Sequence, residues 1–255
     1  MILTEDLSKS YAGTLALAGL NLRVQPGEIL GFLGPNGAGK STTVKILTGM
    51  LRPGSGRAVV AGFDVVEQPL QAKQRIGYVP ETPALYDTLT ASEYLDLVGS
   101  LYHLDPGVIE ARSEELLALF GLAGVQNQRL REFSKGMRQK VVIASALIHR
   151  PEVLILDEPL DGLDANTALV VKELLKKLAS QGKTILFSSH ILEVVERICT
   201  RIVINDKGRM VTEGTAEAIR HSSGAATLEE AFSRLTGVRD AGLVSSEFLE
   251  ALERV

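Results

Sequence analysis

A glycine-rich segment between residues 34 and 41 carries the clearest chemistry in this sequence. It reads Gly34-Pro35-Asn36-Gly37-Ala38-Gly39-Lys40-Ser41 and fits the phosphate-loop pattern G-x-x-x-x-G-K-[ST]. In such a loop the backbone N–H groups face phosphate oxygens, and the helix that follows adds its N-terminal dipole. We expect Lys40 to reach the β- and γ-phosphates of a nucleotide, Ser41 to offer its hydroxyl to Mg²⁺, and Thr42 to donate to another phosphate. The alternative is a glycine-rich turn with a surface lysine.

Two adjacent carboxylates follow an apolar run later in the chain. The segment Val153-Leu154-Ile155-Leu156 has strand character and ends in Asp157 and Glu158. At the carboxyl end of a strand, Asp157 would lie beside the phosphate loop and hold Mg²⁺ through water. Glu158 would polarise a water molecule for attack on the γ-phosphate, because phosphoryl transfer needs an oriented nucleophile. In isolation the pair would be read as solvated acids that end a strand.

A third segment, from Phe133 to Gln139, marks the start of a helix. Ser134 is a good N-cap, and Gly136 allows another backbone to come close. The positive end of a helix dipole attracts anions. Alone, this segment indicates an ordinary capped helix, so its functional interpretation depends on the rest of the sequence.

The elements that must position these residues alternate between strand and helix. Apolar runs predict strands at 29–33, 57–61, 75–79, 153–156 and 184–188. Helical spacing dominates from about 82 to 150, with start signals at Thr90, Asp105 and Ser134. This alternation predicts a mainly parallel sheet with helices on both faces.

Two further elements follow the last of these strands. Residues 202–213 are expected to form a hairpin that turns at 205–208. Thr227 and Glu230 have the spacing of a capping box in front of a short terminal helix. That helix would bury Leu228, Ala231, Phe232 and Leu235.

Composition sets outer limits on function. The 255 residues are 45% hydrophobic and 23% charged, as expected for one large globular domain or two modest ones. Because 27 basic residues face 31 acidic ones, we expect no nucleic-acid partner. The single cysteine excludes an internal disulfide. The first residues do not read as a signal peptide, and the apolar runs fall short of the ~20 residues that span a bilayer. We therefore expect a cytoplasmic protein.

Together these motifs resemble those of the ATP-binding cassette (ABC) ATPases, and the resemblance covers nearly the whole chain. The signature of that family is L-S-G-G-Q, in which the serine and second glycine contact the γ-phosphate of ATP bound to the opposite subunit. Ser134 and Gly136 match these positions. Phe133, Lys135 and Met137 depart from the pattern, and Lys135 would add a positive charge near the phosphates.

The resemblance implies roles for four more residues. Tyr11 stands where an aromatic ring stacks on adenine, and His190 matches the switch histidine that contacts the γ-phosphate. Asp164 belongs to the loop that crosses the dimer interface. Glu81 replaces the usual glutamine that contacts Mg²⁺ and water, so it would coordinate Mg²⁺ with more charge or be solvated at the surface. For Tyr11, His190 and Asp164, the alternatives without a role at the nucleotide are a loop tyrosine, a structural histidine and a helix start at the surface.

The expected architecture is an α/β phosphate-loop NTPase core with a mainly parallel sheet, an N-terminal antiparallel portion and a helical subdomain. We place the nucleotide-binding domain at 1–220, its helical subdomain at about 82–150 and a small helical extension at 221–255. The segment from Thr227 to Gly237 resembles the tail of exporter-type cassettes, which favours export.

The predicted function is that of an ATP-binding and ATP-hydrolysing subunit of an ABC transporter. Two like or unlike cassettes would close around two ATP molecules with Mg²⁺ and drive export through a separate integral-membrane permease. The chain would then lie peripherally on the inner face of the cell membrane. A soluble ABC ATPase acting on ribosomes or DNA is one alternative. A regulatory module that hydrolyses little ATP is another, which intact Lys40, Asp157, Glu158 and His190 disfavour.

Overall fold

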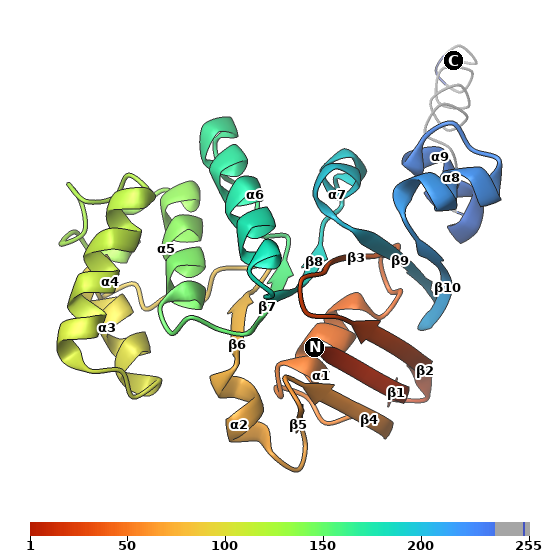
Figure 1. Ribbon diagram of the computed structural model, residues 1–255, viewed down its shortest axis with the longest axis horizontal. Helices are drawn as coiled ribbons and strands as arrows, with labels where there is room; N and C mark the ends of the chain where they lie inside the picture. Colours follow the sequence, from red (N-terminus) through yellow and green to blue (C-terminus); the bar gives the residue numbers. More distant parts are fainter. Residues whose placement is uncertain (238–251, 253–255) are drawn as a thin grey trace.

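The computed structural model describes residues 1–237 and residue 252. Its strands form two sheets that enclose helix α1, Lys40–Leu47, between them (Figure 1). The larger sheet has the strand order β10-β9-β3-β8-β7-β6, and the smaller one β2-β1-β4-β5. In chain order the strands are β1 (Ile2–Tyr11), β2 (Thr14–Val24), β3 (Ile29–Leu33), β4 (Ser55–Val60), β5 (Phe63–Asp64), β6 (Ile76–Val79), β7 (Val153–Asp157), β8 (Thr184–Ser188), β9 (Arg201–Asp206) and β10 (Arg209–Gly214).

The two sheets differ in the direction of their strands. The larger sheet is parallel from β9 through β3, β8 and β7 to β6, and β10 adds one antiparallel edge. The smaller sheet is antiparallel throughout. The fold class expected from the sequence is confirmed.

The helices follow the predicted alternation. Helices α3, α4 and α5 group at one end of the larger sheet, and α7, α8 and α9 lie toward the other end (Figure 1). After α1, the helices are α2 (Pro69–Gln74), α3 (Ala91–Leu101), α4 (Pro106–Leu119), the 3-10 turn η1 (Leu130–Glu132), α5 (Lys135–Leu147), α6 (Ala165–Ser180), α7 (Leu192–Ile198), α8 (Ala216–Ser223) and α9 (Leu228–Thr236).

Alternate residues of the central strands fill two separate apolar cores. Leu30 and Phe32 of β3 join the core that contains α1 and the smaller sheet. Ile29 and Leu33 of the same strand join the core that contains α3 to α7. Successive side chains of a strand point to opposite faces, so a strand buried on both faces becomes a continuous apolar run. The loops that follow β3 and β7 are therefore attached to rigid, fully buried strands.

Local signals set most helix starts. Thr90 Oγ1 accepts the N–H of Glu93 at 3.1 Å, and Glu93 Oε2 accepts the N–H of Thr90 at 2.8 Å, which completes the expected capping box. The second box is displaced by one residue. Thr227 Oγ1 accepts the N–H of Glu230 at 3.1 Å, but the Glu230 carboxylate accepts the N–H of Ala226 at 2.8 Å.

The expected hairpin forms, but its turn is shorter than predicted. Lys207 and Gly208, with φ values of 48° and 76°, make the two-residue connection between β9 and β10. Positive φ at both positions matches the twist of a hairpin. Asn205 was expected in this turn and instead lies fully buried within β9.

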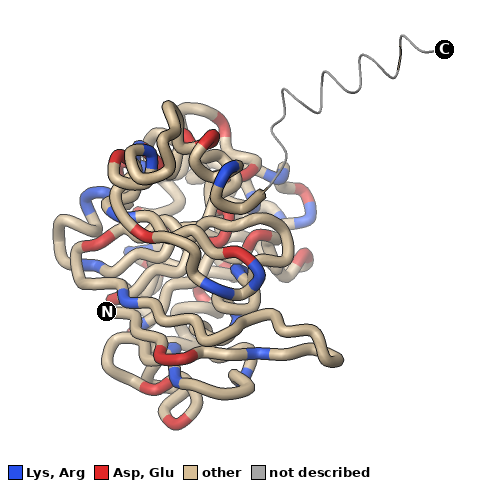
Figure 2. Tube along the Cα trace, turned by 90° about the vertical axis from the view of Figure 1, so that its right-hand side faces the viewer, with Lys and Arg blue, Asp and Glu red and all other residues tan. Residues whose placement is uncertain are grey.

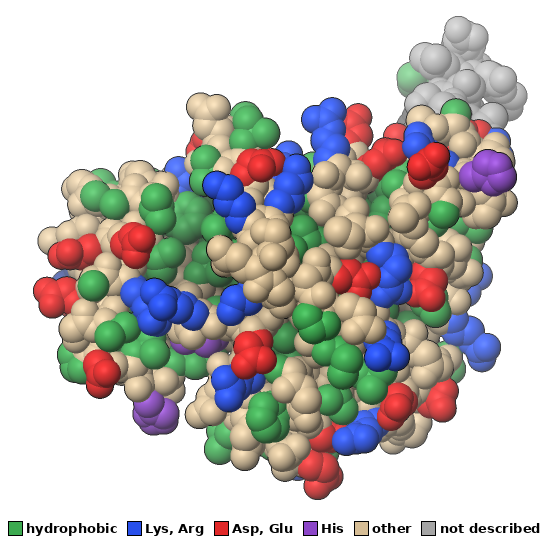
Figure 3. Space-filling model, viewed as in Figure 1, with side chains coloured by type: hydrophobic (Ala, Val, Ile, Leu, Met, Phe, Trp, Pro, Cys, Tyr) green, Lys and Arg blue, Asp and Glu red, His purple; other side chains and the backbone are tan. Residues whose placement is uncertain are grey.

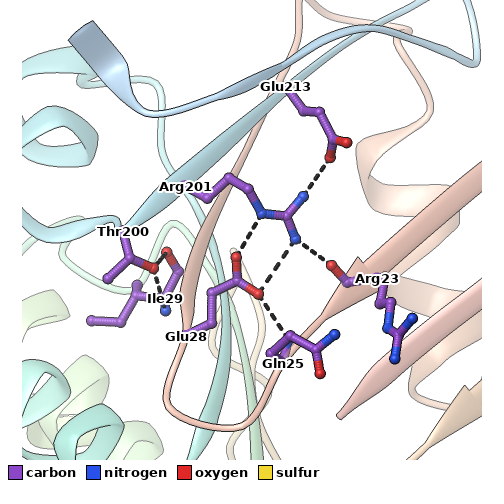
Figure 4. Close-up of polar contacts among 7 residues, drawn as sticks. All are labelled: Arg23, Gln25, Glu28, Ile29, Thr200, Arg201 and Glu213. Carbon is purple, nitrogen blue, oxygen red and sulfur yellow. Dashed lines mark hydrogen bonds and ion pairs between the residues drawn. The ribbon is translucent and has the colours of Figure 1, made fainter. Parts of the chain in front are cut away.

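Arg201 ties the start of β9 to both sheets (Figure 4). Its Nε lies 2.6 Å from Glu28 Oε1, and its guanidinium also contacts Glu213 of β10 and the carbonyl oxygen of Arg23 in β2. Glu28 Oε2 in turn accepts the N–H of Gln25 at 2.7 Å. These bonds fix the start of β3 relative to its neighbours, and with it the loop at the other end of β3.

Charged residues of both signs are interspersed over the face of the molecule shown in Figure 2. That pattern agrees with the small net charge of −4. Among residues 1–237 and 252, no helix has the length and apolar character needed to cross a membrane.

Candidate active site

The phosphate loop connects β3 to α1. Gly39 has a φ of 96°, and a Cβ at this position would lie 2.5 Å from the carbonyl oxygen of Ala16, so glycine is required there. Lys40 begins α1, and its Nζ donates to the carbonyl oxygens of Gly34 and Pro35, the second at 3.1 Å. The loop therefore wraps around the ammonium group.

The β9–β10 hairpin is hydrogen-bonded to the phosphate loop. The side-chain amide of Asn205 donates to the carbonyl oxygen of Ala38, which also accepts the N–H of Gly208 at 3.2 Å. The carbonyl oxygen of Gly208 accepts the N–H of Ala18 at 2.9 Å. Sequence reasoning missed Asn205 because it treated the residue as part of a turn. A polar residue that continues an apolar strand pattern was the available signal.

The two carboxylates follow β7 at the same edge of the sheet. Asp157 is 7% exposed, and its Oδ1 accepts a hydrogen bond from the hydroxyl of Ser188 on β8. Glu158 has a φ of 48°, and its N–H donates to the carbonyl oxygen of Ser188 at 3.2 Å. A left-handed conformation is costly for a residue with a side chain and is typical of functional sites. The chain turns sharply between the two acids.

His190 comes next to Glu158 across the sheet edge. Its Nδ1 lies 2.9 Å from Glu158 Oε2. The Glu158 side chain is 17% exposed, whereas that of His190 is 71% exposed. The structure thus brings together two residues that the sequence separates by 32 positions.

These groups line a cavity of 450 Å³. Nine of the predicted site residues line it, together with residues that the sequence analysis did not select. The predicted members are Gly34, Pro35, Asn36, Lys40, Ser41, Glu81, Asp157, Glu158 and His190. The additional members are Leu33, Ser189, Leu192 and Phe232.

The remaining predicted residues lie outside the lining of this cavity. They are Tyr11, Gly37, Ala38, Gly39, Thr42, Ser134, Gly136 and Asp164. Four of them belong to the phosphate loop or the first turn of α1. Tyr11 ends β1, is 46% exposed, and lies 5.9 Å from Lys9 Nζ, measured to its ring centroid.

The turn at Ser134 is packed against the loop that follows the carboxylates. Ser134 Oγ accepts the N–H of Met137 at 3.3 Å and caps α5 as predicted. A Cβ on Gly136 would lie 2.6 Å from the carbonyl oxygen of Gly162, so the two backbones touch. Lys135 Nζ lies 2.7 Å from Asp161 Oδ2 of the same loop. The charge of Lys135 is thus partly balanced within the chain.

Asp164 caps the next helix, α6. Its carboxylate accepts the N–H of Thr167 at 2.9 Å and the hydroxyl of the same residue at 2.6 Å. Lys140 Nζ on α5 lies 3.4 Å away. These hydrogen bonds hold the pKa of Asp164 at about 2, so the residue remains ionised at neutral pH. Lys140 thus links α5 to the first turn of α6.

Burial and charge act in opposite directions within the cavity. Burial lowers the pKa of Lys40, and the nearby charges of Asp157, Glu158 and Glu81 oppose that change. Burial raises the pKa of Glu158, and His190 opposes the increase. A lysine with three acids near it, at the end of a glycine-rich loop, suits a phosphate that arrives with a divalent cation.

The fold and the site define a phosphate-loop nucleotide-binding cassette: a strand, a glycine-rich loop and a helix, with paired carboxylates on an adjacent strand. The chain belongs to the ABC transporter family, whose characteristic sequence matches residues 17–161. It is an ATP-binding cassette ATPase of that family.

Known proteins agree with this assignment. The ABC transporter ATP-binding protein NatA of Bacillus subtilis (strain 168) is 42% identical over 228 residues, which cover 87% of this chain and 92% of NatA. The Nod factor export ATP-binding protein I of Cupriavidus metallidurans (strain CH34) is 36% identical over 236 residues, or 92% of this chain and 78% of that protein. A dimeric ATP-binding cassette in a post-hydrolysis state with ADP and Pi superposes with a TM-score of 0.78 at 27% identity, covering 84% of this chain and 98% of that one.

Proposed function

We propose that this chain hydrolyses ATP within a dimer of cassettes and drives export through a separate membrane permease. The observation that carries the proposal is the cavity in which Lys40, Asp157, Glu158 and His190 converge beside the phosphate loop. Lys40 binds the β- and γ-phosphates, and Glu158 orients and deprotonates the attacking water. His190 contacts the γ-phosphate. Thr42 and the loop from Gly34 to Gly39 supply the remaining phosphate contacts.

The oxygen atoms in the cavity fit Mg²⁺. The hydroxyl of Ser41 and the carboxylates of Asp157 and Glu81 line the same space, and Mg²⁺ prefers oxygen ligands and retains several waters. When bound, the ion would neutralise charge that develops on the transferred phosphoryl group. Asp157 is already fixed by Ser188, so its carboxylate is preorganised for this role.

Ser134, Gly136 and Asp164 act on the ATP of the partner cassette. They lie outside the cavity of their own chain, yet α5 and α6 hold them together on one side of the loop that follows the carboxylates. A two-fold arrangement gives each cavity the signature turn of the other chain. The dimeric ADP-bound cassette supports this arrangement. Tyr11 stacks on the adenine.

The permease has a suitable docking surface. Hydrophobic side chains gather in a hollow between α4 and α6 (Figure 3), which has a volume of 820 Å³ and lies away from the nucleotide cavity. Leu119 and Val170 are exposed in this groove. Three basic residues and one acidic residue lie along it: Arg150, Lys177, Lys183 and Glu173. We assign it to a permease helix with one apolar face and acidic flanks. Binding there would connect the helical subdomain, residues 82–150, to membrane transport.

The family supports a proposal about the direction of transport and the location of the chain. The relative that takes part in Nod factor export supports an exporter, and the permease would hold the chain on the cytoplasmic face of the membrane. Residues 1–220 would form the nucleotide-binding domain and 221–255 the extension. Helix α8 crosses the boundary between the two, and residues 238–251 and 253–255 lie outside the described part of the chain. The partner is expected to be a protein and not a nucleic acid.

The test is a pull-down of the tagged full chain from detergent extracts of its native cells, followed by mass spectrometry. A polytopic membrane protein should be recovered in stoichiometric yield. Leu119→Glu should abolish this recovery, whereas Leu70→Glu should not. The two leucines are matched, with 69% and 72% exposure, but only Leu119 lines the groove. Recovery of ribosomal or DNA-repair proteins in place of a permease would support a soluble ABC ATPase.

A further inference from the structure

Helix α9 places an aromatic side chain at the nucleotide cavity. Phe232 is half-buried and lines the cavity together with Leu192, the first residue of α7. His190, which also lines the cavity, precedes Leu192 by two residues. The hairpin of helices α8 and α9 thus reaches the cavity near His190.

The polar contacts at the start of α7 involve its own neighbours in sequence and Glu158. Ser189 Oγ accepts the N–H of Ile191 at 3.1 Å, and Ile191 occupies the N-cap position. Within the described chain, the His190 side chain is hydrogen-bonded to Glu158. Since α7 has only seven residues, its position must depend on how its sides are packed.

The α8–α9 hairpin packs on α7 and fixes it from outside. Arg220 of α8 pairs with Glu196 of α7 at 3.5 Å. Leu228 and Ala231 of α9 are buried in the same apolar core as Val195 of α7. Helices α8 and α9 lie together in Figure 1, and α9 also contacts α7. The position of α7 therefore depends on how α9 packs against this shared core.

The hairpin itself is internally braced. Arg234 Nη1 donates to the carbonyl oxygens of Ser223 and Gly224, at 3.0 Å and 2.7 Å, and the Arg234 side chain also pairs with Glu230. Gly224 ends α8 in a left-handed conformation with a φ of 64°. The contacts join the last turn of α8 to α9, so the two helices behave as one unit.

We propose that Phe232 is a positioning residue for ATP hydrolysis. This inference rests on the proposed function. Phe232 packs against the apolar core that contains Val195 of α7 and lines the same cavity as Leu192. It thereby fixes His190 beside Glu158 and the γ-phosphate. Loss of the ring would leave space in the packing of α9 against this core, and α7 would shift by a fraction of a helical turn. A small misplacement of a reacting group lowers the rate far more than it lowers binding.

The experiment compares steady-state ATP hydrolysis by full-length variants. Phe232→Ala should lower kcat by about 10- to 100-fold with little change in KM for ATP. Phe232→Leu should recover most of the rate. Leu235→Ala is the matched control, because Leu235 lies on the same helix, is half-buried and does not line the cavity. It should hydrolyse ATP at close to the wild-type rate.

A double mutant separates positioning from general destabilisation. In a His190→Ala background, Phe232→Ala should cause almost no further loss of kcat, because both changes remove the same contribution. Full additivity of the two losses would overturn the proposal, as would a wild-type kcat for Phe232→Ala or an equal loss for Leu235→Ala. If Phe232→Ala does not fold, the same double-mutant cycle is measured with Phe232→Leu. Its smaller loss of kcat must then disappear in the His190→Ala background. Failure of the wild-type chain to hydrolyse ATP would instead contradict the proposed function.

Discussion

His190 Nδ1 and Glu158 Oε2 lie 2.9 Å apart, and the register of two parallel strands brings them together. Asp157 at the end of β7 is paired with Ser188 at the end of β8, so the residues that follow each strand emerge side by side. An ionised carboxylate accepts a hydrogen bond from Nδ1–H, which leaves Nε2 for a further contact. The pair thus joins the proposed base to the proposed γ-phosphate contact.

Glu158→Gln should stop hydrolysis and retain ATP binding. The amide keeps the size of the carboxylate but cannot accept a proton from water, so the rate should fall by about 10²- to 10⁴-fold. In the proposed dimer, ATP would fill both halves of each shared site, so the variant should accumulate as an ATP-bound dimer. Size-exclusion chromatography with light scattering measures this directly.

The matched control for that variant is Glu110→Gln, an exposed glutamate on α4 that lies outside the nucleotide cavity. It should hydrolyse ATP normally and show no ATP-trapped dimer. A Glu158→Gln chain that stays monomeric at high protein and ATP concentrations would contradict the shared-site arrangement.

The pH dependence of kcat should show the environment of Glu158. Burial raises the pKa of this carboxyl group, with His190 opposing the increase. A general base acts when deprotonated, so activity should be present above the raised pKa and lost as the pH falls through it. The acidic limb should therefore lie above the ordinary glutamate value of about 4.3. A limb at or below that value, with the chain shown to be folded by circular dichroism, would argue against Glu158 as the base.

Lys40→Ala should remove ATP binding or turnover. The ammonium is held inside the phosphate loop by the carbonyl oxygens of Gly34 and Pro35, where a phosphate would be its natural partner. Loss of such a charged donor typically lowers the rate by about 100-fold or more. Lys45→Ala, at an exposed position on the same helix, is the control and should behave as the wild type. Unchanged turnover in the Lys40 variant would overturn the phosphate-loop assignment.

Much of the fold could be predicted because the signals are local. A buried strand such as 29–33 is apolar at every position, and the Thr90 box is complete within four residues. The same holds for the phosphate loop, whose residues are contiguous. These features depend on neighbours in the sequence, so a single sequence contains them.

The remainder depends on tertiary contacts. Asn205 looks like a turn residue by type, but burial against Ala38 places it inside β9. Phe232 has the spacing of an ordinary apolar helix face, and only the packing of α9 on α7 brings it to the cavity. Lys135 pairs with Asp161, which lies 26 positions further along the chain. Contacts between segments that lie far apart in the sequence leave no local pattern from which they could be predicted.

Glu81→Gln should retain ATP hydrolysis but need more Mg²⁺. Glu81 follows β6, lines the cavity with Ser41 and Asp157, and is exposed. An amide oxygen can still bind Mg²⁺, so the rate at saturating metal should stay within about tenfold, equivalent to roughly 1.4 kcal/mol. The neutral ligand attracts the cation less, so half-maximal activity should require a higher Mg²⁺ concentration. Glu81→Ala removes the oxygen altogether and should lower the rate further. A complete loss in the glutamine variant would mean that the carboxylate does more than contact the metal.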